Sequence, residues 1–522
     1  MRAFLLACLL VVPHVASAAA PSARSATPHA VLGDATEAEL DAYITHAMRE
    51  WKQPGLSIVV VKDGRPVYMK GFGVRSIGGG RVGVDTKFGM MSTTKAMTAL
   101  AIAMLVDEGK LAWDDPVQKT LPWFQMPDAD FSRRVTVRDT LRHNAGLGGD
   151  SDMLWLSGAY STRQLLERVP ALTPAYAPYA GFGYSNVMYQ VAGELVSAAS
   201  GMPWDTFVQT RIIDPLGMSR SHATLGRMQA AHDPDVTLAH FEIDGTLRQI
   251  AEQPVDAVPA AGAAWTTARD AARWLQFLLA EGDAGGKRLV SEAGFRELFK
   301  PQVLAPADFY PTTQLTRPRW TSYGLGWFQQ DYRGQFLAMH TGSIDGRTAL
   351  VALVPDRELG IAVFGNADHV ELRHALMLKV IDLDLGGATR DWSAELRALY
   401  AGFADQAAKA RAERASRRVV GTRPTRPLAA YAGTYVHPAF GDLRVALDDG
   451  ALVVGFGANP QMAGVLTHWH YDTFDMRLGD GRYPASSIRF ELDDRGEVTA
   501  ASIDSTTRFV RAAGPAAATA TK

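Results

Sequence analysis

Cysteine is almost absent from this chain of 522 residues, in which Cys8 is the only one. Cys8 lies in an apolar N-terminal segment that we predict is removed on export, which would leave a mature protein without cysteine. Such a protein can form no disulfide and has no cysteine nucleophile or thiolate metal site. Covalent chemistry must then use an oxygen or nitrogen nucleophile.

A large net charge of either sign and long apolar runs are also lacking. The 53 Lys and Arg residues nearly balance the 55 Asp and Glu residues, so no basic field points to a nucleic-acid partner. The apolar run Phe4 to Val12 is shorter than the about 20 residues that span a membrane, and we expect no transmembrane anchor. The expected partner is a small-molecule or peptide substrate, and the sequence makes no prediction of the oligomeric state.

The first 18 residues have the three parts of a secretory signal peptide. Arg2 supplies the positive charge, an apolar run follows, and Ala16-Ser17-Ala18 fits a cleavage site. Lipidation at Cys8 is not favoured, because the apolar run continues past it. We therefore predict a periplasmic or secreted protein that is not a lipoprotein. The Ala/Pro/Ser-rich residues 19–33 and the tail 513–522 are expected to be disordered.

Residues 34–390 predict one α+β domain. Strand patterns occur at its two ends and mostly helical patterns between them, so both ends are expected to share one antiparallel sheet that carries a helical subdomain. The expected strands are 56–61, 66–72, 324–330, 335–340, 347–354 and 359–364. The expected helices are 36–51, 92–108, 136–143, 162–169, 187–200 and 266–282.

The remaining chain changes character. Residues 391–427 are expected to form an amphipathic helix, Trp392 to Ser416, followed by a Pro-containing linker. Residues 428–512 alternate short apolar runs with Asp-Gly and Gly-Asp turns, which predicts a small all-β domain, either a sandwich or a barrel.

A Ser-x-x-Lys motif, Ser92 to Lys95, occurs once in the chain at the start of a predicted helix. Residues three apart lie on one helix face, so the Ser92 hydroxyl can meet the Lys95 amine. A serine becomes a good nucleophile when a base takes its proton, and a buried lysine can lose its charge and act as that base. An isolated match can equally be a helix-capping serine followed by an exposed lysine.

Two further motifs favour the catalytic interpretation. Tyr184-Ser185-Asn186 is the only Tyr-x-Asn, and His340-Thr341-Gly342 is the only Lys/His-Thr-Gly; the second ends a strand-like run. We expect Gly342 to let a substrate backbone approach that strand. The N–H of Ser343 would join that of Ser92 in an oxyanion hole.

The three motifs, in this order, resemble those of the penicillin-recognising serine hydrolases. This superfamily includes class C β-lactamases, DD-peptidases, D-aminopeptidases and β-lactamase-like esterases. Four more segments are similar to family motifs: 135–147, 215–218, 262–274 and Tyr323 to Trp327. The resemblance implies a β-lactamase/transpeptidase-like fold over about residues 37–385. The segment 428–512 is similar to the small β-barrel appended to many such hydrolases.

The resemblance also implies roles. Ser92 would be the nucleophile, and Lys95 and Tyr184 would share proton transfer. Asn186 would hold Lys95 and the substrate amide, while His340 and Thr341 would contact polar groups of the substrate. His340 stands where typical class C β-lactamases have lysine, and histidine is charged only part of the time near neutral pH. The sequence therefore favours ester or amide cleavage, including D-amino-acyl peptides, over β-lactam hydrolysis.

Two alternatives stay open: a class C-like β-lactamase, and a slowly acylating penicillin or peptidoglycan sensor or assembly module. A Gly-x-Ser-x-Gly motif is lacking, which argues against an α/β-hydrolase esterase. His369, Glu371 and His374 do not have the zincin spacing, since the histidines are five residues apart. We predict no metal site and no cofactor.

Overall fold

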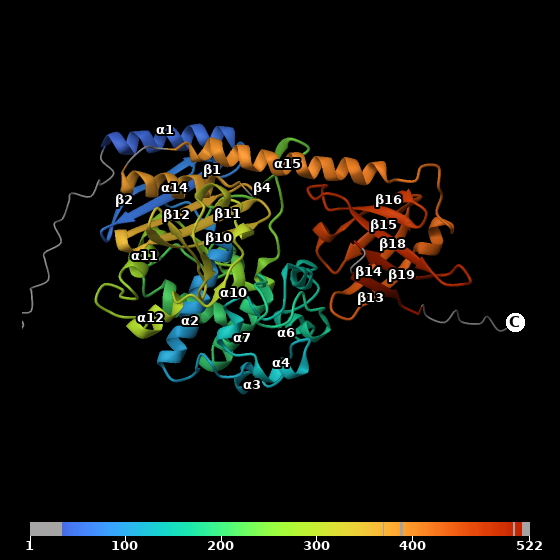
Figure 1. Ribbon diagram of the computed structural model, residues 1–522, viewed down its shortest axis with the longest axis horizontal. Helices are drawn as coiled ribbons and strands as arrows, with labels where there is room; N and C mark the ends of the chain where they lie inside the picture. Colours follow the sequence, from blue (N-terminus) through green and yellow to red (C-terminus); the bar gives the residue numbers. More distant parts are fainter. Residues whose placement is uncertain (1–33, 369, 387–389, 505–506, 514–522) are drawn as a thin grey trace, which may run out of the picture.

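The computed structural model describes residues 34–368, 370–386, 390–504 and 507–513. The predicted signal peptide, residues 19–33 and all but the first residue of the predicted tail lie outside the described residues. Figure 1 shows two bodies side by side, joined along one edge by helix α15 (Trp392–Ser416). Within the described ranges, no helix combines the length and apolarity needed to cross a membrane.

The larger body is built on one antiparallel sheet of eight strands. As the sequence predicts, both ends of the domain contribute, because N-terminal strand β1 pairs with the late strand β12. In sheet order the strands are β2 (Arg65–Gly73), β1 (Gly55–Lys62), β12 (Leu359–Gly365), β11 (Arg347–Val354), β10 (Gln335–Ile344), β9 (Phe328–Tyr332), β8 (Thr321–Tyr323) and β7 (Val303–Leu304).

Each face of this sheet has its own core, since successive side chains of a strand point to opposite faces. In β1, Ile58 and Val60 pack on one side, with α1 (Asp34–Glu50) and α14 (Leu372–Leu385). Val59 and Val61 pack on the other side, with the helical subdomain. Burial on both faces explains why all eight residues of β1 are buried.

The helical subdomain carries the first two motifs. Its main helices are α2 (Lys95–Asp107), α7 (Asn186–Ser200), α11 (Ala268–Leu279) and α12 (Glu292–Leu298), which lie below the sheet in Figure 1. The N-terminal part of the predicted helix 92–108 is instead a 3-10 turn, Met91–Thr94. Helix α7 ends where the sequence predicts and starts one residue earlier, with Ser185 as its N-cap and Gly201 as its left-handed C-cap.

The predicted helix 136–143 is wrong. Only a 3-10 turn, Arg138–Thr140, forms there. The Asp139 carboxylate accepts from both the N–H and the hydroxyl of Thr136 at 2.9 Å, which closes a local turn. His143 then adopts a left-handed φ of 59°, which no helix continues through.

Two other expected boundaries shift. The predicted helix 162–169 ends at Leu166, shortly before Pro170 in a separate 3-10 turn. The predicted strand 324–330 is the second half of a hairpin, because Gly326, with a φ of 87°, turns the chain between β8 and β9.

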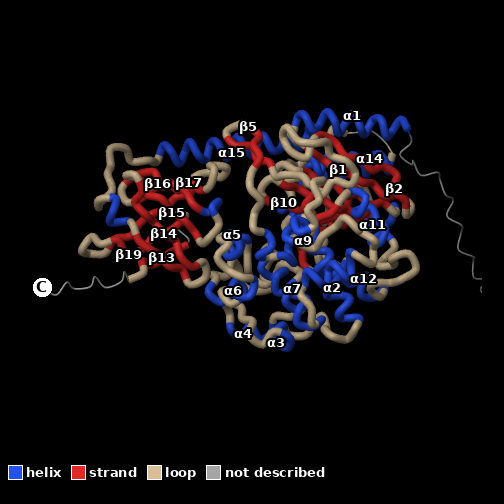
Figure 2. Tube along the Cα trace, turned by 180° about the vertical axis from the view of Figure 1, so that it is seen from behind, coloured by secondary structure: helices blue, strands red, loops and turns tan. Residues whose placement is uncertain are grey.

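The smaller body is a closed barrel of eight antiparallel strands, which resolves the choice between sandwich and barrel. Figure 2 shows these strands as a group separate from the large sheet. They are β13 (Gly433–His437), β14 (Gly441–Asp448), β15 (Ala451–Phe456), β16 (Ala463–His470), β17 (Thr473–Leu478), β18 (Ser486–Leu492), β19 (Val498–Ile503) and β20 (Thr507–Arg511). Their inward side chains form a separate core.

Helix α15 forms as predicted, and the apolar residues near its N-terminus pack on the larger body. Trp392 and Leu396 are fully buried against the larger body, with Leu399 and Tyr400 half-covered beside them. Towards its C-terminus, Arg414 donates to Ser487 of the barrel at 2.9 Å. The helix therefore belongs to the core of the larger body at its N-terminus and contacts the barrel near its C-terminus.

Candidate active site

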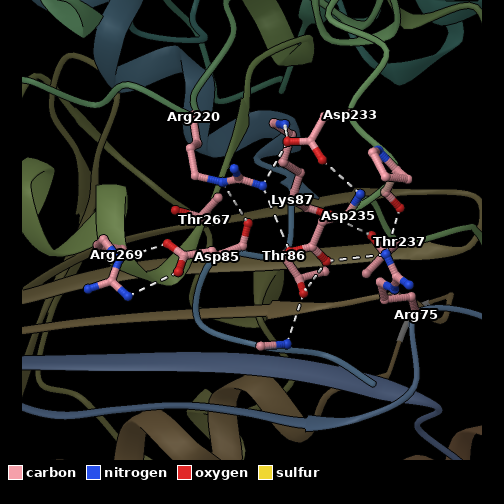
Figure 3. Close-up of polar contacts among 12 residues, drawn as sticks. Arg75, Asp85, Thr86, Lys87, Arg220, Asp233, Asp235, Thr237, Thr267 and Arg269 are labelled. Atoms are coloured by element: carbon pink, nitrogen blue, oxygen red, sulfur yellow. Dashed lines mark hydrogen bonds and ion pairs between the residues drawn. The ribbon is translucent and has the colours of Figure 1, made fainter. Parts of the chain in front are cut away.

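A polar network holds the chain segment that leads to the Ser-x-x-Lys motif. Figure 3 shows residues 85–87 joined to the loop 233–237, with Thr86 donating to Asp235 at 2.7 Å. The buried Lys87 ammonium pairs with Asp233, and this hydrogen bond lowers the pKa of Asp233 to about 2. Arg269 donates to Asp85 at 2.7 Å. The network fixes the entry to β3 (Phe88–Gly89), directly before the motif.

Ser92 lies in a strained turn. Met91, the residue before it, has a φ of 48°, which a non-glycine residue rarely adopts. Such strain costs on the order of 1–3 kcal/mol and persists where the surrounding structure enforces it. Met91 is buried beside strand β10, whereas Ser92 stays half-exposed and lines a cavity.

Lys95 is completely buried directly beneath Ser92. Its ammonium nitrogen lies 3.0 Å from Ser92 Oγ, 2.7 Å from Asn186 Oδ1 and 2.8 Å from the carbonyl of Ala261. Burial lowers the pKa of Lys95 to about 7, although the negative charge of Asp152 opposes the shift. A lysine in this state can accept a proton from Ser92 near neutral pH.

Tyr184 lies over the same lysine. The Lys95 nitrogen is 4.8 Å from the Tyr184 ring centroid, and the His143 ring packs 4.2 Å from that ring. Burial raises the pKa of Tyr184 well above 10, although its hydrogen bond with Ser92 opposes the shift. The phenol is therefore protonated at neutral pH and can donate its proton but not act as a phenolate base.

Asp152 is a site residue that the sequence analysis missed. Its Oδ2 accepts from the Asn186 amide nitrogen at 2.9 Å, so the amide oxygen of Asn186 faces Lys95. Asp152 thereby orients a residue that contacts the lysine, as a carboxylate orients the histidine of a catalytic triad. The surrounding Gly149–Asp152 turn has no motif that could have identified it.

His340 is brought to the same place, but its expected charge is wrong. The ring is 1% exposed, its Nδ1 lies 2.6 Å from the carbonyl of Thr341, and its Nε2 lies 3.1 Å from the Tyr323 hydroxyl. The first contact requires Nδ1–H, which leaves Nε2 as an acceptor for Tyr323. Burial and the nearby Lys95 charge lower the pKa of His340 to about 3. Sequence alone does not reveal that burial.

Gly342 and Thr341 make contacts within the protein that the sequence analysis did not predict. A Cβ on Gly342 would lie 2.6 Å from the Met91 Cβ and 2.7 Å from the Ser92 backbone nitrogen. The chain that carries Ser92 thus requires glycine here, and the approach of a substrate backbone stays a prediction. The Thr341 hydroxyl is largely buried and lies 2.9 Å from that of Tyr310.

A narrow cavity opens beside Ser92. Its volume is about 30 Å³, and Asn186, Ser343, Trp155 and Ile344 are among its lining residues. That is space for about one or two water molecules. A larger cavity of about 660 Å³ lies among Phe295, Phe299 and Phe336 and contains none of the predicted site residues.

The barrel contacts two residues that lie next to residues lining this cavity. Asp345 follows β10 and accepts from Gln253 at 2.5 Å, from Arg482 of the barrel at 3.0 Å and from the Tyr483 hydroxyl. The barrel residue Asn459 donates to the Leu156 carbonyl at 2.7 Å, and Leu156 follows the lining residue Trp155. These contacts join residues far apart in sequence, and no local pattern predicts them.

Comparison with known proteins reveals distant relatives. The chain is 28% identical to Unguisins hydrolase ungD' of Aspergillus campestris over 80% of this chain and 79% of the relative. It is 24% identical to Protein flp of Staphylococcus aureus over 63% of each chain.

Solved structures show the same fold. An octameric penicillin-binding protein homologue from Pyrococcus abyssi matches with a TM-score of 0.58 at 22% identity, covering 91% of this chain and 99% of that one. SurE matches with a TM-score of 0.53 at 21% identity, over 92% and 99%. A family model of a domain of unknown function (DUF3471) covers residues 417–513. The Beta-lactamase family model covers residues 40–384, so this chain belongs to the beta-lactamase family, whose members are typically serine hydrolases.

Proposed function

We propose that this protein is an exported serine hydrolase that cleaves an ester or amide bond through an acyl-enzyme on Ser92. The observation that carries the proposal is the contact between Ser92 Oγ and the buried Lys95 amine, at 3.0 Å. Burying a lysine so that its pKa falls to near neutrality costs folding free energy. Groups with such shifted pKa values are found mostly at active sites.

The proposed reaction has two halves. Lys95 takes the proton of Ser92 as Oγ attacks the substrate carbonyl, and the N–H groups of Ser92 and Ser343 bind the resulting oxyanion. The bond to the leaving alcohol or amine then breaks, and Tyr184 gives that leaving group a proton, which Lys95 can replace. Water next attacks the acyl-enzyme and releases the acid and free Ser92.

The pH dependence of acylation follows from this assignment. Below a pH of about 7, Lys95 holds a proton and cannot accept that of Ser92, since its pKa is lowered to about 7. We expect kcat/KM for p-nitrophenyl butyrate to fall about tenfold for each pH unit below this value and to level off above it. The pKa of Tyr184 lies well above 10, so Tyr184 adds no alkaline limb below pH 9.5.

Asp152→Asn provides the control for this profile. The Asp152 charge raises the pKa of Lys95, so its removal should move the acid limb to lower pH. Initial rates from pH 5 to 9.5, read at the isosbestic wavelength of nitrophenol, give the acid limb and the plateau. A wild-type profile that is flat from pH 5 to 9 would show that Lys95 is not the base.

The expected substrates are esters and amides, including D-amino-acyl peptides, in preference to β-lactams. The neutral, buried His340 supplies no positive charge for a β-lactam carboxylate. One charge-assisted hydrogen bond contributes about 1.5–3 kcal/mol, or roughly 10- to 150-fold in rate. Hydrolysis as the reaction also accords with the distant relative that is named a hydrolase of unguisins.

A substrate panel tests this preference. We expect kcat/KM for p-nitrophenyl butyrate or a D-aminoacyl anilide to exceed that for nitrocefin by at least about tenfold. Because His340 is uncharged, lowering the pH to 5.5 should not improve nitrocefin relative to the ester. A tenfold preference for nitrocefin would favour the β-lactamase alternative. A fluorescent penicillin that stays on Ser92 without turnover, with no hydrolysis of any ester or anilide, would favour the sensor alternative.

Export remains a prediction of the sequence. Its support is the charged, apolar and Ala-x-Ala pattern of residues 1–18.

A further inference from the structure

A buried guanidinium lies behind the strand that offers the second oxyanion donor. Arg373, near the start of α14, is 5% exposed. Its Nη1 donates to the Gly342 carbonyl at 2.5 Å and to the Ser343 hydroxyl at 2.8 Å. No part of the proposed reaction has yet used this residue.

The Gly342 carbonyl and the Ser343 N–H belong to the same peptide unit. A hydrogen bond from a charged donor to a carbonyl is stronger than one from a neutral donor, and it polarises the whole peptide. Electron density moves towards the oxygen, so the N–H on the other side of the unit becomes a stronger donor. Arginine is suited to this task because it keeps its charge when buried.

An acidic partner holds this guanidinium in place. Nη2 donates to Glu371 Oε1 at 2.9 Å, and Glu371 Oε2 lies 2.6 Å from His374 Nδ1. Although burial raises the pKa of Glu371, the charges of Arg373 and His374 lower it well below its usual range. The carboxylate is therefore ionised, and the pair compensates the cost of burying the arginine.

We propose that Arg373 is a positioning residue that strengthens the oxyanion-binding N–H of Ser343 through the Gly342–Ser343 peptide. The inference rests on the proposed function, because it requires an oxyanion to form at Ser92. It supplies a cation that acts on this strand, where His340 is neutral. Arg373 reaches the oxyanion only through the peptide.

The test compares Arg373→Met with Glu371→Gln and Arg373→Lys. Direct removal of an oxyanion donor costs about 10²- to 10³-fold, so the loss of its polarising partner should cost about 10- to 30-fold in kcat, with KM within about threefold. The Ki of phenylboronic acid, which binds Ser92 as a tetrahedral anion, should rise by the same factor. Arg373→Lys keeps a charged donor and should recover part of the loss.

Glu371→Gln separates electrostatics from scaffolding. It removes the opposing charge, but the glutamine side-chain oxygen can still accept from Arg373 Nη2 and hold the guanidinium, so kcat should stay within about threefold of wild type. Equal losses in Glu371→Gln and Arg373→Met, or a rise in KM with unchanged kcat, would mean that the network is only structural. Full kcat in Arg373→Met would also overturn the inference. If Arg373→Met does not fold, kcat and the boronate Ki are compared between Arg373→Lys and Glu371→Gln. A larger loss in Arg373→Lys would support the inference, and equal losses would mean that the network is only structural.

The parent proposal fails separately. If Ser92→Ala hydrolyses the ester normally, the acyl-enzyme proposal itself is wrong. If Ser92→Ala is inactive while Arg373→Met is fully active, only the role of Arg373 is wrong.

Discussion

Replacing Ser92 by alanine is expected to lower turnover of every substrate by roughly 10⁴-fold or more. The side chain of Ser92 is half-exposed, lines the cavity and contacts the buried Lys95 amine. Without its oxygen no acyl-enzyme can form, and only binding-derived catalysis remains. The measurement is kcat/KM for p-nitrophenyl butyrate, together with labelling by a fluorophosphonate probe.

Ser197→Ala is the matched control. Ser197 lies on α7, and its hydroxyl donates to the Gly193 carbonyl at 3.0 Å, away from the three motifs. It makes the same chemical change in a helix of the same subdomain, and we expect near-normal rates and labelling. A Ser92→Ala enzyme that retains a tenth of the wild-type rate would exclude Ser92 as the nucleophile.

Lys95→Ala and Tyr184→Phe are each expected to slow acylation by about 10²- to 10⁴-fold. Both side chains contact the Ser92 hydroxyl, and they lie against each other, with the Lys95 nitrogen 4.8 Å from the Tyr184 ring. Because they serve one proton path, the double variant should be little slower than the worse single variant. Single-turnover rates of the nitrophenol burst measure this.

Tyr189→Phe controls for the loss of a phenol close to the lysine. Its ring is also 5.2 Å from the Lys95 nitrogen, but its hydroxyl donates to the Leu141 carbonyl at 2.7 Å. Losing that structural hydrogen bond should cost less than about tenfold in rate. Losses that multiply fully in the Lys95/Tyr184 double variant would instead assign the two residues to independent steps.

Some of this site could be predicted because its geometry is local. Ser92 and Lys95 are one turn apart, so their contact follows from helical spacing. The shared sheet also follows from strand patterns at both ends of the domain, and β1 does pair with β12. Placing Tyr184 and Asn186 beside Lys95 required the family resemblance, since Asn186 is 91 positions from Lys95 in the sequence.

The wrong and the missed predictions concern burial and side-chain contacts, which local sequence patterns do not encode. His340 was expected to be partly charged, but charge depends on burial. The rings of Tyr184, Tyr323 and Phe328 lie around its ring, and the residue is only 1% exposed. Helix 136–143 failed because Asp139 bonds to the backbone of its own turn, a competition that hydrophobic periodicity does not register. Asp152 and Arg373 act through Asn186 and Gly342. Neither belongs to a sequence motif that would distinguish it from a charged residue on the surface.

The buried junction at Asp345 has a consequence for how this chain can be taken apart. Arg482 and Tyr483 of the barrel neutralise and hydrogen-bond a carboxylate two residues beyond Ser343. Without the barrel, that carboxylate would lose its only cationic partner among the described residues and would keep the Gln253 amide alone. The barrel is therefore not an interchangeable module. A chimera that exchanged it for another eight-stranded barrel would have to carry an arginine and a tyrosine at these two places to keep the contacts of Asp345.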